Sequence, residues 1–200
     1  MPRRTVAFAS GSSFHLYNRG VNKQPIFLES RNYPFFVQLL DKYLNHDGAI
    51  IAAYCLMPNH YHLLVRVDYG SLSTRMQRLG MAYTNAVNKA NHRTGPLFQG
   101  RFKAKAIDQD EYLLQLSRYL HLNPVEAGLV DEPAGWPYSS YAAYLGLQSD
   151  ILVHPELVLS QFSTSGESGP NRKAAAAAYK KFIEGIADET TPPIGHLTFD

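Results

Sequence analysis

The sequence has a single cysteine and no long apolar run. Cys55 alone cannot form an internal disulfide, which suits the reducing cytoplasm where we expect this protein. No apolar segment comes close to the length of about 20 residues that a membrane-spanning helix needs. The segment Thr5–Ser13 is too short and too polar for the core of a signal peptide. With 45% hydrophobic and 18% charged residues, the chain has the composition of a folded soluble protein without membrane contact.

Acidic residues are missing from a long internal stretch. No Asp or Glu lies between Ser71 and Ile107, in a chain whose net charge is only +2. A block of one sign in a nearly neutral chain is the footprint expected for a polyanion partner, although a solvated basic face is the alternative. The candidate contacts are Arg75, Arg78, Lys89, Arg93, Arg101, Lys103 and Lys105, with Gln99 beside them and Arg19 near the N-terminus.

Hydrophobic periodicity predicts the first half of the fold. Residues 14–19 alternate as a strand does, and Ser30 or Asn32 can cap a helix that runs to about His46. The nearly continuous apolar run Ala49–Leu56 predicts a buried central strand. The Pro-Asn turn after it leads into a second strand, so the two should pair antiparallel.

The second half of the pattern continues the alternation. It predicts a helix over 72–92, a strand over 98–107, and a helix that opens with a capping box of Asp108 and Glu111 and is limited by Pro124. The outward face of the first of these helices is expected to carry Arg75, Arg78 and Lys89. The order β-α-β-β-α-β-α indicates an α+β fold, an antiparallel sheet packed against helices and ferredoxin-like in outline.

Composition divides the chain into three parts. Residues 1–12 are expected to form a flexible tail, and residues 13–146 the main domain. Residues 147–200 change character, with a Ser/Gly-rich linker at 163–171, an Ala-rich helix at 172–186 and a polar end. We therefore expect a small helical C-terminal extension followed by a disordered tail.

A His-Tyr-His triplet opens the second strand of the predicted pair. Residues two apart on a strand point to the same face, so His60 and His62 project together while Tyr61 faces the other way. Two adjacent imidazoles make half of a metal site. Two unrelated polar positions on a solvated strand remain the alternative.

Further downstream, Tyr119 and Asn123 are four residues apart and share one face of the last predicted helix. Two imidazoles and one amide oxygen would leave open positions on a divalent ion such as Mg²⁺ or Mn²⁺. Such an ion could polarise a phosphodiester that the phenol of Tyr119 attacks. The resulting phosphotyrosine ester could be attacked by another hydroxyl, so this chemistry both cuts and rejoins strands.

Three segments carry a family resemblance. The segments 57–65, 95–103 and 118–130 resemble the single-tyrosine HUH transposases of the IS200-like superfamily, and most closely the REP-associated tyrosine transposases. The resemblance implies a ferredoxin-like HUH domain that cleaves and rejoins single-stranded DNA beside a hairpin. It also implies a 5′-phosphotyrosine intermediate and a divalent metal. By position His60 and His62 match the family's metal-binding histidines and Tyr119 its nucleophile, and we assign Asn123 as the third ligand.

Several alternatives stay open at the level of sequence. Tyr112 is the rival nucleophile, two helical turns before Tyr119. The chain could instead be a metal-dependent nuclease that uses water, or a non-catalytic binder of hairpin DNA. His15 on the first strand is expected to be a structural histidine, and His121 to lie on a different helix face from Tyr119. The REP-associated branch resembles monomers, so we favour a monomer over a dimer.

Overall fold

The sheet has four antiparallel strands. In the computed structural model, which describes residues 8–45, 48–162 and 171–185, the strand order is β2-β3-β1-β4. The strands are β1 (Ser12–Arg19), β2 (Ala49–Met57), β3 (His60–Val67) and β4 (Lys103–Ile107). This arrangement confirms the predicted antiparallel pairing of the strands on either side of the Pro-Asn turn.

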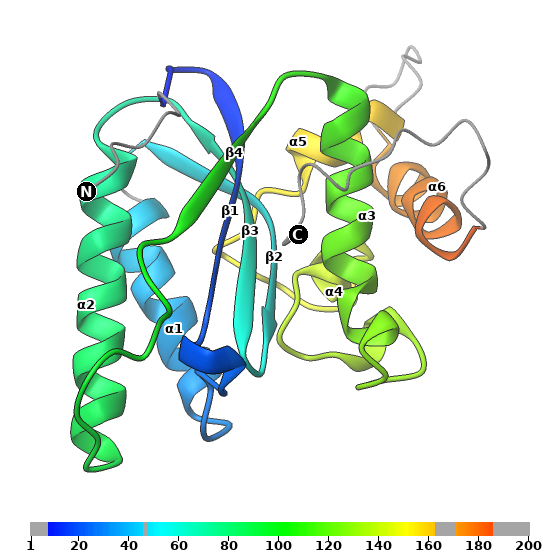
Figure 1. The fold of residues 1–200 in the computed structure, drawn as a ribbon. Helices are drawn as coiled ribbons and strands as arrows, with labels where there is room; N and C mark the ends of the chain where they lie inside the picture. The colour runs from blue at the N-terminus through cyan, green and yellow to red at the C-terminus, as the bar shows by residue number, and fades with distance from the viewer. Residues whose placement is uncertain (1–7, 46–47, 163–170, 186–200) are drawn as a thin grey trace.

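Helices cover both faces of the sheet (Figure 1). One face carries α1 (Asn32–Leu40), which continues into a π-helical turn (Asp41–Asn45), and α2 (Leu72–Ala90). The other face carries α3 (Asp110–Glu126), α4 (Tyr141–Tyr144), α5 (Glu156–Leu159) and α6 (Arg172–Glu184). Short 3-10 turns lie at Val21–Lys23, Pro133–Gly135 and Ser160–Phe162. The predicted α+β class and ferredoxin-like order are confirmed. No helix among these described segments is long and apolar enough to cross a membrane.

Strand alternation sorts the side chains of β3 between two core layers. Tyr61, Leu63 and Val65 pack in the layer that α1 and α2 cover, whereas Leu64 packs with α3. His60 and His62 are four and two residues before Leu64, so their side chains share its face of the strand and point toward α3. This alternation puts the two imidazoles on the face opposite to α1 and α2.

The predicted central position of β2 is wrong. β2 lies at the edge of the sheet, although nearly all of its residues are buried. The chain after α3 covers its free edge, where Leu56 N–H donates to the Tyr138 carbonyl and His154 N–H donates to the Ile51 carbonyl. An edge strand that is covered in this way needs the same continuous apolar sequence as a central one.

Two predicted helix ends differ in detail. Gln109 is the N-cap of α3, and no side chain caps it, so the predicted capping box of Asp108 and Glu111 is not formed. The helix also runs through Pro124 to Glu126, and Gly128 just beyond the C-cap has a left-handed φ of +67° that prevents the helix from continuing. Proline disfavours helical geometry in the preceding residue without forbidding it, so Asn123 stays within α3.

The cap predicted for α1 also differs. Asn32 lies inside the helix, and its side-chain oxygen accepts hydrogen bonds from the backbone N–H groups of Leu28 and Glu29 in the preceding turn. No side chain caps the N-terminus of α1. Asn32 therefore stabilises the turn that leads into the helix.

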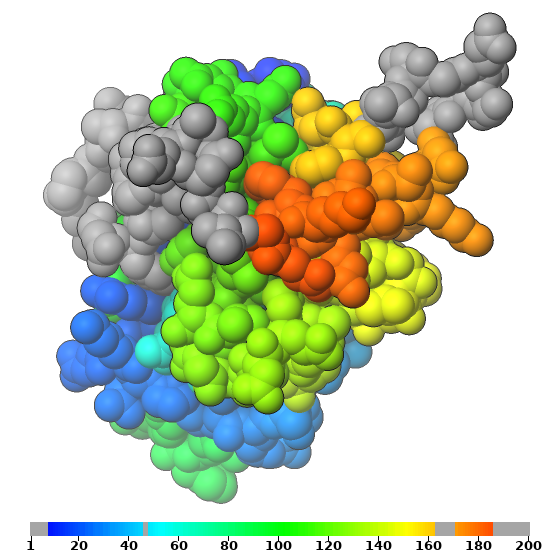
Figure 2. Space-filling model, turned by 90° about the vertical axis from the view of Figure 1, so that its right-hand side faces the viewer, coloured from blue at the N-terminus to red at the C-terminus, as the bar shows by residue number. Residues whose placement is uncertain are grey.

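The predicted C-terminal helix is present as α6 and packs on α3. In Figure 2 the surface of α6 (orange) lies directly beside the green surface of the α3 region. Tyr179 of α6 is fully buried in the core layer that contains Leu116 and Leu120 of α3. The predicted linker at 163–171 and the predicted disordered tail lie almost wholly outside the described residues, as does most of the N-terminal tail. Phe8 is described, and its ring contacts those of Phe14 and Phe102.

Candidate active site

The four residues predicted as one site come together between β3 and α3. The ring of Tyr119 meets the ring of His62 edge-on, with centroids 5.3 Å apart and an interplanar angle of 83°. Asn123 Oδ1 lies 3.3 Å from His60 Nε2, and the two imidazole centroids are 4.9 Å apart. A phenol, an amide and two imidazoles therefore share one small volume.

The packing of α3 sets this geometry. Leu116 and Leu120 are fully buried against the sheet, in the same core layer as Cys55 and Leu64. Tyr119 and Asn123 are one helical turn apart on the adjoining face and so both reach the histidines. The apolar contacts of α3 thus position the two polar side chains.

Asn59 orients the first imidazole. Its amide nitrogen donates to the Lys23 carbonyl at 3.1 Å, which leaves the amide oxygen facing His60 Nδ1 at 2.6 Å. Nδ1 must therefore carry the proton of a neutral imidazole, and Nε2 presents its lone pair toward Asn123. Burial, together with the nearby positive charge of Arg19, lowers the pKa of His60 to about 4, so the ring is neutral at pH 7.

The second imidazole is fully buried. Burial, with the neighbouring His15 and His60, lowers the pKa of His62 well below its ordinary value. His62 Nδ1 lies 2.8 Å from His15 Nε2, and the two rings stack with centroids 5.0 Å apart. His62 is therefore a neutral imidazole with one nitrogen held by His15.

The nitrogen and oxygen atoms of these side chains suit a divalent cation as ligands. Two neutral imidazoles and an amide oxygen are ligands that borderline or hard divalent ions accept. With Nδ1 of His60 protonated, the lone pairs of His60 Nε2 and Asn123 Oδ1 face each other, and a cation between them would satisfy both. Nowhere in the described part of the chain do three or more His, Cys, Asp or Glu side chains gather as a metal site, so Asn123 is needed to complete a set of three.

Comparison with known proteins identifies the family. The family model described as transposase IS200 like matches residues 9–123, more than half of the chain, and this match includes all four site residues. The chain belongs to this family. The family resemblance predicted from the three sequence segments is confirmed.

Two similar proteins carry the same name. The chain is 29% identical over 100 residues to a Haemophilus influenzae protein provisionally named a REP-associated tyrosine transposase; the match covers 44% of this chain and 57% of that protein. It is 27% identical over 93 residues to the REP-associated tyrosine transposase of Escherichia coli K12, covering 46% and 53%. The chain thus spans about half the length of the curated relatives it matches.

A solved structure shares the fold. It is described as a REP-associated tyrosine transposase bound to a REP hairpin, and it superposes with a TM-score of 0.64 at 19% identity. The match covers 86% of this chain and 98% of the other. It supports the family's fold for this chain, including most of the region beyond residue 123.

The structure separates the predicted polyanion contacts into groups. The exposed ones are Arg78, Lys89, Gln99, Arg101 and Lys103, and the half-buried ones are Arg19, Arg93 and Lys105. The predicted outward orientation is wrong for Arg75, which is 6% exposed and donates to the Tyr69 carbonyl. Arg75 lies near the start of α2, where the loop before the helix folds over it.

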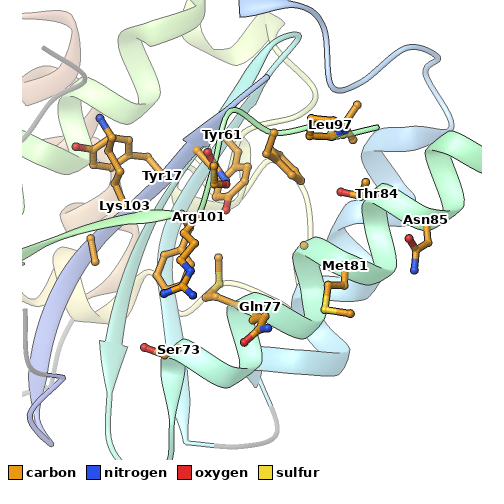
Figure 3. A pocket seen from close by; sticks show the side chains of 18 of the residues that line it. Tyr17, Tyr61, Ser73, Gln77, Met81, Thr84, Asn85, Leu97, Arg101 and Lys103 are labelled. Atoms are coloured by element: carbon orange, nitrogen blue, oxygen red, sulfur yellow. The ribbon is translucent and has the colours of Figure 1, made fainter. Parts of the chain in front are cut away.

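A pocket of about 930 Å³ lies between α2 and the segment 96–105 (Figure 3). Its wall includes the aromatic residues Tyr61 and Phe98, the amide of Gln77 on α2 and the cation Arg101. The four site residues do not line it, because the histidines point to the opposite face of the sheet from Tyr61. The pocket therefore adjoins the predicted basic surface, and its lining also includes Tyr17 and Lys103, which lie on the same face of the sheet as His62.

Two residues in contact with the histidines were not predicted as part of the site. Asn59 stands in the turn that the sequence marks, but only the position of the Lys23 carbonyl reveals its orientation. His15 was expected to be structural, and its contact with His62 depends on the pairing of β1 with β3. By contrast, His121 lies away from the site as expected, with its nitrogens 2.7 Å from Tyr179 Oη and 2.8 Å from Ser140 Oγ.

Proposed function

We propose that this protein is a transposase that cleaves and rejoins single-stranded DNA beside a hairpin through a covalent bond to Tyr119. The observation that carries the proposal is the meeting of α3 and β3. The phenol-bearing ring of Tyr119 lies against His62, and the amide of Asn123 faces His60. A nucleophile and a set of metal ligands are thus adjacent, as phosphoryl transfer requires.

In the proposed reaction, Tyr119 Oη attacks the phosphorus of a phosphodiester. The new bond between Oη and phosphorus forms as the phenolic proton leaves, and the bond from phosphorus to the 3′ oxygen breaks. The products are a free 3′ hydroxyl and a 5′-phosphotyrosine ester. Attack by another 3′ hydroxyl on that ester regenerates Tyr119 and joins the strands, so no further reactant is consumed.

His60, His62 and Asn123 would hold the Mg²⁺ or Mn²⁺ ion. When bound, such an ion supplies Lewis-acid stabilisation of charge on the phosphate oxygens. The protein's part is to keep both imidazoles neutral, which their burial favours, and to fix the rings from behind through Asn59 and His15. A neutral imidazole offers a lone pair that a protonated ring does not.

Hairpin DNA is the proposed substrate, on two grounds. The structurally similar REP-associated transposase is described as bound to a REP hairpin. In this chain, Lys103 and Lys105 of β4 lie 5.9 and 5.8 Å from the ring of Tyr17, on the same face of the sheet as His62. Cations beside the site could attract phosphates toward Tyr119. Within this proposal we favour a monomer, and a dimer is the alternative.

The proposal is tested by incubating the protein with end-labelled single-stranded hairpin oligonucleotides, with and without Mg²⁺ or Mn²⁺, followed by a denaturing gel. We expect a protein-linked band that needs the metal and is lost in Tyr119→Phe. Cleavage without that band in either protein would instead indicate a nuclease that uses water. Tight binding of hairpins without any cleavage would indicate a non-catalytic DNA-binding protein, for which the four clustered residues would have no catalytic role.

A further inference from the structure

His15 and His62 form a hydrogen-bonded pair behind the candidate metal site. Both side chains are 0% exposed, and His15 Nε2 lies 2.8 Å from His62 Nδ1. The register of β1 against β3 pairs Tyr17 with His62 and His15 with Leu64, so the two imidazoles are diagonal neighbours on one face. The ring of Tyr17 lies 4.7 Å from that of His15 and helps to hold its plane.

Only one of two proton arrangements allows His62 to bind a metal. If His15 Nε2 carries the proton and donates, His62 Nδ1 is the acceptor, and the neutral His62 ring then has its own proton on Nε2. If His62 Nδ1 carries the proton and donates to His15 Nε2, the lone pair of His62 Nε2 is available to a cation. Metal binding therefore requires His15 to act as the acceptor.

We propose that His15 is a positioning residue that accepts the Nδ1 proton of His62 and so presents His62 Nε2 to the metal. It parallels Asn59, whose amide oxygen faces Nδ1 of His60 at 2.6 Å. Each metal-binding imidazole would thus have its own acceptor in the second layer, one from the turn before β3 and one from β1. This inference rests on the proposed metal site and adds a residue that does not itself touch the metal.

Two amide substitutions provide a matched test. The side-chain amide of His15→Gln reaches the position of Nε2 and can still accept from His62, whereas that of His15→Asn corresponds to Nδ1 and falls short. Mn²⁺ affinity of the purified protein is measured without DNA, from the loss of the free Mn²⁺ signal in electron paramagnetic resonance. We expect His15→Asn to weaken binding by about 10- to 100-fold and His15→Gln to retain most of the affinity.

Equal affinity in His15→Asn and the unsubstituted protein would overturn the inference, as would equal losses in the two variants. His62→Ala serves as the control for the site itself. If the unsubstituted protein does not bind Mn²⁺, the proposed metal centre fails. The role of His15 is then tested by finding which ring nitrogen of His15 carries the proton. Imidazole ¹⁵N resonances should show the His15 proton on Nδ1, and a proton on Nε2 would contradict the proposal even in a protein that binds no metal.

Discussion

The buried His121 should make the free energy of unfolding of this protein depend on pH. Replacing His121 with a residue that does not titrate should remove its part of that dependence. His121 of α3 is fully buried, with its nitrogens against the hydroxyls of Tyr179 on α6 and Ser140. Burial lowers its pKa from 6.5 to about 3. The native protein therefore keeps the ring neutral at mildly acidic pH, while the unfolded chain takes up a proton below pH 6.5.

The sign and size of the effect follow from proton linkage. Because the unfolded state binds more protons, the free energy of unfolding falls as the pH is lowered from 6.5 toward 3. Between pH 7.5 and pH 5.5, a histidine with an unfolded pKa near 6.5 contributes a loss of about 1.4 kcal/mol. His60 and His62 are also buried and add to the loss, so a variant is needed to isolate His121.

Urea unfolding of the unsubstituted protein and of His121→Gln at both pH values measures this contribution. Glutamine does not titrate, so the unsubstituted protein should lose about 1.4 kcal/mol more than the variant between the two pH values. The variant should also be less stable at pH 7.5, because the hydroxyl of Tyr179 loses one of its two hydrogen-bond partners and keeps only Ser117 Oγ. Equal losses in the two proteins would refute the argument, because they would mean that His121 has the same pKa in the folded and unfolded states.

Two further predictions concern the metal site and the basic strand. Asn59→Ala should weaken Mn²⁺ binding by about 10- to 100-fold, measured by calorimetry, because His60 loses the acceptor for its Nδ1 proton. Asn88→Ala is the control, since that amide also donates to a backbone carbonyl but lies on α2; an equal loss in both would contradict a specific role for Asn59. The double variant Lys103→Ala, Lys105→Ala should reduce the slope of log affinity for single-stranded DNA against log salt concentration by about 1.4. An unchanged slope would exclude phosphate contacts by this strand.

The other strands and the main helices could be predicted because their apolar periodicity is local, but the strand predicted over 98–107 is too long. β4 begins at Lys103, and of the described residues 98–102 before it only Phe98 forms an isolated bridge, to Gly20. The edge position of β2 could not be predicted, because an edge that the residues 136–154 cover needs the same apolar sequence as a centre. The end of α3 was misjudged for a related reason. The tertiary packing of the buried Pro124 outweighs its local preference, and the left-handed Gly128 sets the actual end.

The candidate site shows the same division. The spacing of His60 and His62 on a strand and of Tyr119 and Asn123 on a helix was enough to predict that each pair shares a face. The structure adds how the pairs meet, through the packing of Leu116 and Leu120. The roles of Asn59 and His15 each depend on one hydrogen bond to a histidine. The first is set by the geometry of the turn before β3 and the second by the register of β1 against β3, and hydrophobic periodicity specifies neither.

The most direct test of the central claim is to locate the covalent bond to DNA. The protein is incubated with hairpin oligonucleotide and Mn²⁺, the DNA is digested with nuclease, and tryptic peptides are analysed by mass spectrometry. Trypsin cuts after Arg118, so Tyr112 falls in peptide 106–118 and Tyr119 becomes the first residue of peptide 119–172. We predict a metal-dependent nucleotide adduct on Tyr119. An adduct on Tyr112, or cleaved DNA with no adduct on either peptide, would contradict the account.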